Sequence, residues 1–167
     1  GLEELTRWGH MKGLEILGTS DFTHPKWFAE IQEKFEPAGE GLYTIKQEFL
    51  NKTDIPASVA DRPFFFMLTS EVSCIYSKGG KVRRLHILLA FPSLEDVAAF
   101  NARLTARGAK LASDGRPILG IDAKEIATIA FDVSEHALVI PAPAWTPWFA
   151  IFGSKSGFDS IEECYEE

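Results

Sequence analysis

Three polar residues follow apolar runs, at positions where they could bind a metal ion. Asp21 and His24 come after the run Leu14–Gly18, and Glu71 comes after Phe64–Thr69. Carboxylates and imidazoles bind hard and borderline metal ions, and two such ions held close together can activate water for phosphate-ester hydrolysis. Because side chains just past the carboxyl ends of parallel strands converge in α/β folds, we expect these three residues to form a metal site.

Each of these residues also has a purely structural interpretation. Asp21 or His24 could cap the helix that follows them, and a neighbouring cation such as Arg84 could neutralise Glu71. His86 stands at the start of an apolar strand, where a histidine is more often a hydrogen-bonded core residue than a ligand. The residues alone leave both interpretations open.

The spacing of apolar residues predicts alternating strands and helices. Helices are expected to begin near Leu2, Pro25, Ser93, Asp122 and Ser160. Strands are expected at Leu14–Gly18, Tyr43–Phe49, Phe64–Thr69, Ser73–Tyr76, Lys81–Arg84, His86–Phe91 and Ala137–Ile140, with a hairpin turn at Gly79 and Gly80. This alternation favours one α/β domain over residues 1–167, with a mainly parallel sheet or barrel.

Composition narrows the class of protein. The chain has 167 residues and a net charge of −7, so its overall charge does not indicate a nucleic-acid binder, although a local basic patch could still act. Its apolar runs are of buried-strand length, too short to cross a membrane. Cys74 and Cys164 lie far apart and in no zinc-binding spacing, which favours a reduced, cytoplasmic protein.

Four runs resemble a known family. They read GLEILGTSDFTHPKW, TSEVSCIYSKGGKVRRLH, SDGRPILGID and WTPWFAIFGSKSGFDSIEEC. In this order they resemble the polymerase and histidinol phosphatase (PHP) superfamily, in its endonuclease Q-like branch. The resemblance implies a distorted β/α barrel that holds zinc or manganese ions and hydrolyses phosphoesters. It also implies action on DNA, with nicking on the 5′ side of deaminated bases and abasic sites.

The resemblance assigns roles to individual residues. It makes Asp21 and His24 metal ligands and Glu71 a catalytic carboxylate that bridges metal ions. It also makes His86 a ligand, against the core interpretation.

The chain departs from the family pattern at several ligands. The family's first His-x-His strand and its closing Asp-x-His motif fall outside residues 1–167, so we expect a section of a larger barrel. The family pattern Pro-Ala-His-x-Trp is here Pro141-Ala142-Pro143-Ala144-Trp145, and Pro143 has no ligand atom. We therefore predict weak binding of zinc or manganese and little nuclease activity for this chain.

Basic and aromatic residues form a second candidate site, for DNA. The expected contacts are Lys81, Arg83, Arg84, Arg116, Trp145, Trp148 and Lys155. Lysines and arginines would bind phosphates, the Gly153–Gly157 run would offer amides to an anion, and the tryptophans would stack on an extruded base. The alternatives are a solvated hairpin, an Arg116 paired with Asp114 or Asp122, and tryptophans that cover the core.

Two classes of function follow. The first is a metal-dependent phosphoesterase or endonuclease that acts on damaged DNA. The second is a non-catalytic, degenerate PHP-like domain that binds nucleic acid or protein. Unpaired strand edges left by missing strands also predict a homodimer.

Overall fold

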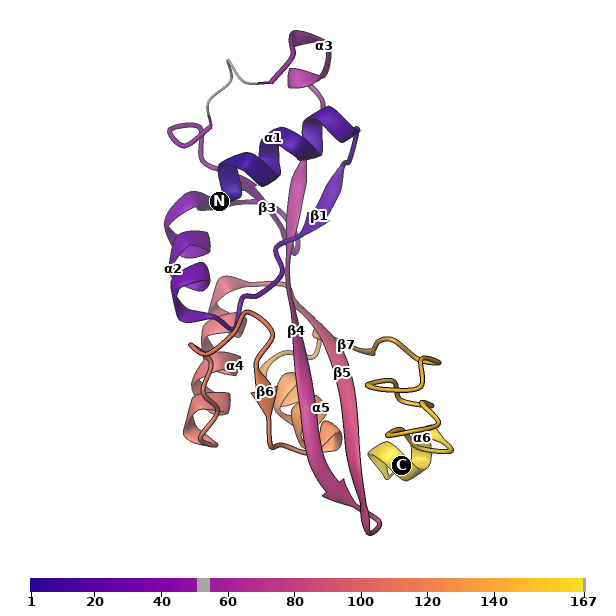
Figure 1. Cartoon of the computed structure of the whole chain (residues 1–167). Helices are drawn as coiled ribbons and strands as arrows, with labels where there is room; N and C mark the ends of the chain where they lie inside the picture. Colours follow the sequence, from indigo (N-terminus) through magenta and orange to yellow (C-terminus); the bar gives the residue numbers. More distant parts are fainter. Residues whose placement is uncertain (51–54, 167) are drawn as a thin grey trace.

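A long antiparallel ribbon, formed by β4 (Phe65–Lys78) and β5 (Lys81–Phe91), runs through the fold (Figure 1). The computed structural model describes residues 1–50 and 55–166. The two strands pair from Leu68 with Phe91 to Lys78 with Lys81. Gly79 and Gly80, with φ of 60° and 72°, make the two-residue turn between them, as glycine does readily in tight hairpins. The predicted hairpin is therefore confirmed.

Glu71 lies inside β4 rather than beyond the end of a strand. The polar pair Ser70 and Glu71 suggested a break, but the two residues only continue the alternation of faces. Ser70 is buried with its hydroxyl 3.2 Å from the Thr23 hydroxyl, while Glu71 faces the other side. The expectation that Glu71 follows the end of a strand was wrong.

The sheet is mixed and mostly antiparallel. Its order is β2-β3-β4-β5-β7, and β1 and β6 also pair with β4. The remaining strands are β1 (Ile16–Gly18), β2 (Phe35–Gly39), β3 (Leu42–Ile45), β6 (Ile118–Leu119) and β7 (Leu138–Pro141). Only β1 and β6 run parallel to β4, and within the described residues the sheet does not close into a barrel.

The α/β class is thus confirmed and the mainly parallel sheet was wrong. The reason lies in the connections. β2 joins β3, and β4 joins β5, through two residues each, and so short a link permits only antiparallel neighbours.

The helices are α1 (Leu2–Lys12), α2 (Pro25–Lys34), α3 (Ala57–Ala60), α4 (Leu94–Ala106), α5 (Ala123–Val133) and α6 (Ile161–Tyr165). Side chains cap three of them, as predicted: Ser93 accepts from the Asp96 amide, Asp122 from Lys124 and Ser160 from Glu163. No helix among residues 1–50 and 55–166 has the length and apolar character needed to cross a membrane.

The ribbon buries one face and leaves the other partly open. We call the buried side the inner face; it carries Val72, Cys74, Leu85, Ile87 and Leu89, all fully buried. Helices α4 and α5 contribute Val97, Phe100, Leu104 and Ile126 to the same core. The opposite side, here the outer face, carries Glu71, Ser73, Ile75, Arg84 and His86.

The first predicted strand is less buried than expected. Leu14 and Ile16 are 41% and 49% exposed, because β1 pairs only with β4 and its other edge is free of partners in the described chain. A strand is present in the predicted range, as β1, but the expectation that it would be buried was wrong.

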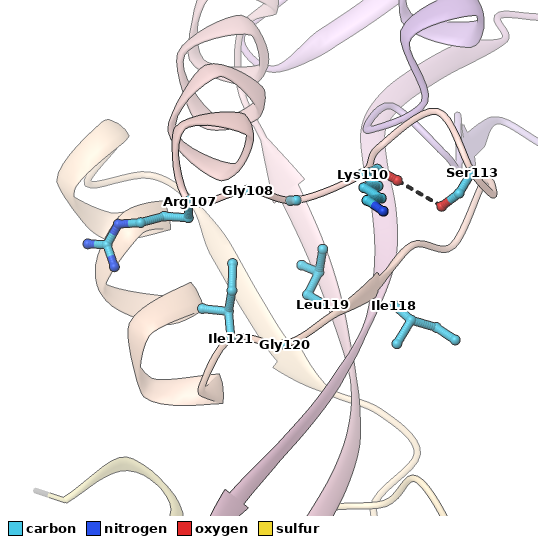
Figure 2. A pocket seen from close by; sticks show the side chains of 9 residues that line it. Arg107, Gly108, Lys110, Ser113, Ile118, Leu119, Gly120 and Ile121 are labelled. Atoms are coloured by element: carbon cyan, nitrogen blue, oxygen red, sulfur yellow. Dashed lines mark hydrogen bonds between the residues drawn. The ribbon is translucent and has the colours of Figure 1, made fainter.

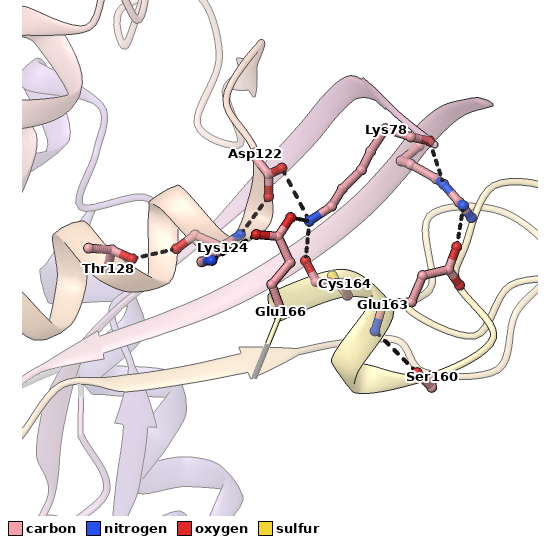
Figure 3. Close-up of polar contacts among 9 residues, drawn as sticks. Lys78, Asp122, Lys124, Thr128, Ser160, Glu163, Cys164 and Glu166 are labelled. Atoms are coloured by element: carbon pink, nitrogen blue, oxygen red, sulfur yellow. Dashed lines mark hydrogen bonds and ion pairs between the residues drawn. The ribbon is translucent and has the colours of Figure 1, made fainter. Parts of the chain in front are cut away.

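Ion pairs hold α6 against the tip of the hairpin (Figure 3). The Lys78 ammonium lies 2.7 Å from a Glu166 carboxylate oxygen and 3.6 Å from Asp122, and it donates to the carbonyl of Cys164. Glu166 also pairs with Lys124 of α5 at 2.8 Å. One hairpin lysine thus links β4, α5 and α6.

These contacts predict acid sensitivity. Hydrogen bonds from Lys124 and Lys78 lower the pKa of Glu166 from 4.5 to about 2. A carboxylate whose pKa is lower in the folded state stabilises the fold above its unfolded pKa and loses that contribution as pH falls toward the folded value. We expect the melting temperature, followed by circular dichroism, to fall between pH 4.5 and 2, and to fall less steeply in Glu166→Gln.

Glu36→Gln is the matched control, because Glu36 is exposed on β2. This variant should keep the slope of the unsubstituted protein. An identical slope in Glu166→Gln would contradict the assignment.

Candidate functional site

The outer face brings Glu71 and His86 together. Glu71 lies opposite Leu88 and Ser73 opposite His86, so His86 is the diagonal neighbour of Glu71, and Arg84 is the next residue of β5 on the same side of the ribbon. The His86 Nδ1 atom is 3.0 Å from Glu71 Oε1, and the imidazole packs on the Phe149 ring at 4.5 Å between centroids. His86 is therefore neither a buried core residue nor a free side chain.

Arg116 completes this cluster. Its guanidinium lies 3.4 Å from the same Glu71 oxygen, while its backbone amide donates to Asp114 Oδ1. Glu71 is thus paired with Arg116 and His86, and not with Arg84, the cation considered from the sequence. Burial of the imidazole and the nearby Arg116 charge lower the pKa of His86, against the opposing effect of Glu71. Because this pKa is below its ordinary value, the His86 imidazole is neutral at pH 7.

Asp21 lies beside the loop that carries Arg116. A Cβ atom at Gly115 would fall 2.5 Å from an Asp21 carboxylate oxygen, so a side chain at residue 115 would displace that carboxylate. The Ser20 hydroxyl donates to the other carboxylate oxygen of Asp21 at 2.9 Å. The end of β1, the 113–117 loop and the outer face therefore meet at one place.

The turn that holds Asp21 is backbone-strained. Ser20 and Asp21 have φ of 56° and 50°, in the left-handed region that non-glycine residues seldom occupy. The Trp27 indole donates to the carbonyls of Ser20 and Thr19, and the Ser20 amide donates to Thr69 Oγ1. Such strain, held by surrounding contacts, is typical of functional turns.

His24 begins α2 rather than joining this cluster. It occupies the N-cap position before Pro25, but its side chain makes no capping hydrogen bond. The Asp21 carbonyl accepts from the His24 amide at 2.9 Å. Asp21 is not the N-cap residue of α2 either, so neither side chain acts as the predicted cap.

The described residues do not make a fitted metal site. Among them, no three His, Cys, Asp or Glu side chains are arranged to hold a metal ion. Glu71 is already engaged by Arg116 and His86, and Pro143 offers no donor. The ligand assignment of Asp21, His24, Glu71 and His86 to zinc or manganese stays a prediction.

Trp145 and Trp148 project into solvent from the segment 144–158, which we call the tryptophan loop. Trp145 is 79% exposed and Trp148 is 50% exposed. Figure 1 shows this segment beside the lower half of β5. The interpretation of both residues as core covers was wrong, while stacking on a base stays a prediction.

The Gly153–Gly157 run does not form the expected anion nest. The amides of Gly153, Lys155, Ser156 and Gly157 donate to carbonyls of Ala150, Pro147, Gly153 and Gly153 respectively. These donors hold the tryptophan loop together and are not available to an anion in this conformation. Lys155 is exposed, and its role in DNA binding stays a prediction.

Arg83 is a structural residue, contrary to the expectation of DNA binding. Strand alternation turns it to the inner face, where it is 5% exposed. Its guanidinium pairs with Glu163 at 2.7 Å, donates to the carbonyls of Gly157 and Lys78, and lies 4.1 Å from the Phe158 ring centroid. It therefore anchors the end of the tryptophan loop and α6.

Residues that the sequence analysis missed position the outer face. Phe149 packs on His86, and its amide donates to the Ser156 hydroxyl. Ser156 also bridges to Arg84 through the Arg84 carbonyl and amide. The only signal in the sequence was their place inside the family-like run WTPWFAIFGSKSGFDSIEEC.

A separate cavity of about 340 Å³ lies between the end of α4 and β6 (Figure 2). Arg107, Lys110, Ser113 and Ile118 are among its lining residues, and the Ser113 hydroxyl donates to the Lys110 carbonyl. Arg107 pairs with Glu125 of α5. None of the predicted site residues lines this cavity, so the candidate site is the outer face.

Comparisons with known proteins identify relatives of this arrangement. The structure is similar to the lesion-specific endonuclease PfuEndoQ from Pyrococcus furiosus, with a TM-score of 0.73 and 27% identity over 99% of this chain and 34% of that one. It is also similar to endonuclease Q in complex with a 27-mer duplex substrate that has an abasic lesion at the active site. That match has a TM-score of 0.71 and 30% identity, over 95% of this chain and 33% of that one.

Sequence comparison gives a further relative. An uncharacterised protein of Methanocaldococcus jannaschii is 26% identical over 146 residues, which are 87% of this chain and 14% of that protein. No family model matches the chain. The matched region covers about one third of the length of the solved endonucleases that the chain resembles.

The fold and the comparisons together define a class. The chain is a mixed α/β domain with an open, mostly antiparallel sheet, and its structure is endonuclease Q-like.

Proposed function

We propose that this chain is a PHP-like, DNA-binding domain of the endonuclease Q type that does not cleave DNA by itself. The observation that carries the proposal is that Arg84 and Arg116 both lie at the outer face, with the exposed Trp148 against Arg84 and a second exposed tryptophan, Trp145, on the same loop as Trp148. DNA would lie along this face, with phosphates near the guanidinium groups.

In this proposal two individual arginines contact phosphates, although the net charge of the chain is −7. Arg116 is half exposed, and its pair with Glu71 at 3.4 Å is long for a hydrogen bond, so a phosphate could replace that partner. The Arg84 guanidinium lies over the Trp148 ring at 5.3 Å, a contact that helps to hold it in place. Cations held this way contact a phosphate backbone without base specificity.

The cluster at Glu71 supports binding rather than catalysis. Glu71 Oε1 lies 3.0 Å from His86 Nδ1, but among the described residues no third carboxylate, imidazole or thiol group joins them to complete a set of metal ligands. A proline at residue 143 removes one more expected donor. Zinc or manganese, if a complete ligand set held it, would supply an activated water; the residues present do not make that set.

The test is DNA binding by fluorescence anisotropy over a range of salt concentrations. We expect a duplex with an abasic site to bind with an affinity that falls as salt rises. Arg84→Ala combined with Arg116→Ala should weaken binding and reduce the slope of log affinity against log salt by about 2, near 1 for each phosphate contact.

Arg103→Ala is the matched control, because Arg103 is an exposed arginine of α4 that pairs with Asp132. It should bind as the unsubstituted protein does. If the double variant bound DNA as tightly as the unsubstituted protein, the outer face would not be the DNA-binding surface. Nicking of the duplex by the purified chain, lost in Glu71→Gln, would contradict the non-catalytic part and favour the endonuclease instead.

A further inference from the structure

We infer that Trp145 and Trp148 form a stacking platform for unpaired bases, so that the domain prefers single-stranded nucleic acid to an intact duplex. The inference rests on the proposed function and adds the class of nucleic acid that the outer face selects.

The tryptophans are exposed although the loop around them is ordered. The Phe152 amide donates to the Ala144 carbonyl at 3.0 Å, and the Lys155 amide donates to the Pro147 carbonyl at 2.9 Å. Ser156 joins both the Phe149 amide and the Arg84 backbone. Because the loop is fixed by its own hydrogen bonds, the outward position of the rings is part of its structure.

Each indole is supported from one side. Trp145 packs on Phe152, with 4.9 Å between ring centroids and 32° between planes. The Arg84 guanidinium lies over the Trp148 ring. Since half or more of each residue is exposed beyond these contacts, each ring keeps surface on which a planar ligand can stack.

The surrounding charge favours a nucleotide as that ligand. A polar cavity of about 120 Å³ borders the tryptophan loop and is lined by Lys81, Lys155 and Ser154 among others. Asp159 also lines this cavity. The two lysine ammonium groups of the cavity and Arg84, which lies against Trp148, suit phosphates, while the indoles suit bases. Bases inside a duplex already stack on each other, so only unpaired ones can use both features.

The experiment compares an oligothymidine strand with a blunt duplex of equal length, by anisotropy at constant salt. The expected result is tighter binding of the single strand. Trp145→Ala and Trp148→Ala should each weaken single-strand binding about 5- to 100-fold, from the loss of one stacked base. Trp148→Phe should keep most of the affinity, because phenylalanine can still stack.

Trp8→Ala is the control, since Trp8 is 46% exposed on α1, away from the tryptophan loop in the sequence. It should bind as the unsubstituted protein does. Circular dichroism and thermal melting verify that each variant is folded. The tryptophan variants should keep the salt slope, which Arg84→Ala should reduce.

The outcomes separate the two proposals. Binding that is unchanged in folded Trp145→Ala and Trp148→Ala, or equal for strand and duplex, would overturn the platform and leave the DNA-binding domain intact. Absence of binding to either DNA would overturn the proposed function as well. Tighter binding of a proline-rich peptide than of the single strand would assign the tryptophans to a protein partner.

Discussion

The Phe22→Ala variant is expected to lose about 3–5 kcal/mol of unfolding free energy. Phe22 is fully buried and packs against Phe91 of β5 and Phe100 of α4, with ring centroids 5.7 Å and 6.4 Å away. Its carbonyl also accepts a hydrogen bond from the Asn101 amide group at 2.9 Å. Truncation would leave a cavity where the turn after β1 meets the ribbon and α4.

Urea denaturation, followed by circular dichroism, measures this loss as a shift of the midpoint. Phe131→Ala serves as the control, because Phe131 of α5 is 52% exposed and should cost within about 1 kcal/mol. A loss below about 1 kcal/mol for Phe22→Ala would show that this ring is not part of the core. Because Phe22 follows Asp21, the variant should also loosen the strained turn beside Arg116.

The second large effect separates two neighbouring arginines. Arg83→Ala is expected to lower the unfolding free energy by about 2–4 kcal/mol, since it removes a buried guanidinium that pairs with Glu163 and donates to the part-buried carbonyls of Gly157 and Lys78. Arg84→Ala should cost less than about 1 kcal/mol, because a cation–π contact with Trp148 is its main side-chain interaction. Nucleic-acid affinity should show the reverse order among folded variants.

Both quantities are measured on the same pair of variants, by urea denaturation and by DNA anisotropy. Arg83→Lys extends the test, because a lysine keeps the charge without the planar fork that reaches three acceptors. It should recover only part of the stability. An Arg84→Ala variant that loses more stability than Arg83→Ala would contradict the assignment of the two faces.

The hairpin turn and the helix starts could be predicted from the sequence, because each depends on interactions between residues that are close along the chain. Gly79 and Gly80 predicted the hairpin, since two glycines readily take the positive φ of a tight turn. Ser93, Asp122 and Ser160 predicted helix starts, because a side-chain oxygen before a helix accepts an otherwise unpaired amide. Both effects act over a few residues and need no distant partner.

Strand partners were not predictable in the same way. Ser70 and Glu71 looked like the end of a strand, although β4 continues through both of them. Ser70 can be buried there because its hydroxyl is hydrogen-bonded to that of Thr23, a residue distant in the sequence. Strands β2 and β6 were missed since their short runs carry little periodic signal. Without the full set of strands, their order and relative direction in the sheet could not be predicted either.

The candidate site divides along the same line. The residues Glu71, His86, Arg116 and the two tryptophans could be selected from the sequence, and the solved structures support the endonuclease Q-like likeness of the whole chain. The roles of these residues stay predictions. The contacts between these residues could not be predicted from the sequence. Glu71 pairs with Arg116, which is 45 positions away, and Arg84 contacts Trp148, which is 64 positions away.

The basic hairpin shows most clearly what each level of structure determined. Sequence by itself determined that Arg83 and Arg84 are adjacent cations on a strand near a tight turn, and alternation required them to face opposite sides. Only the tertiary structure decided which side is covered. Helix α6 and Glu163 bury Arg83, whereas the tryptophan loop leaves Arg84 at the outer face, because packing joins segments some 70 to 80 residues apart.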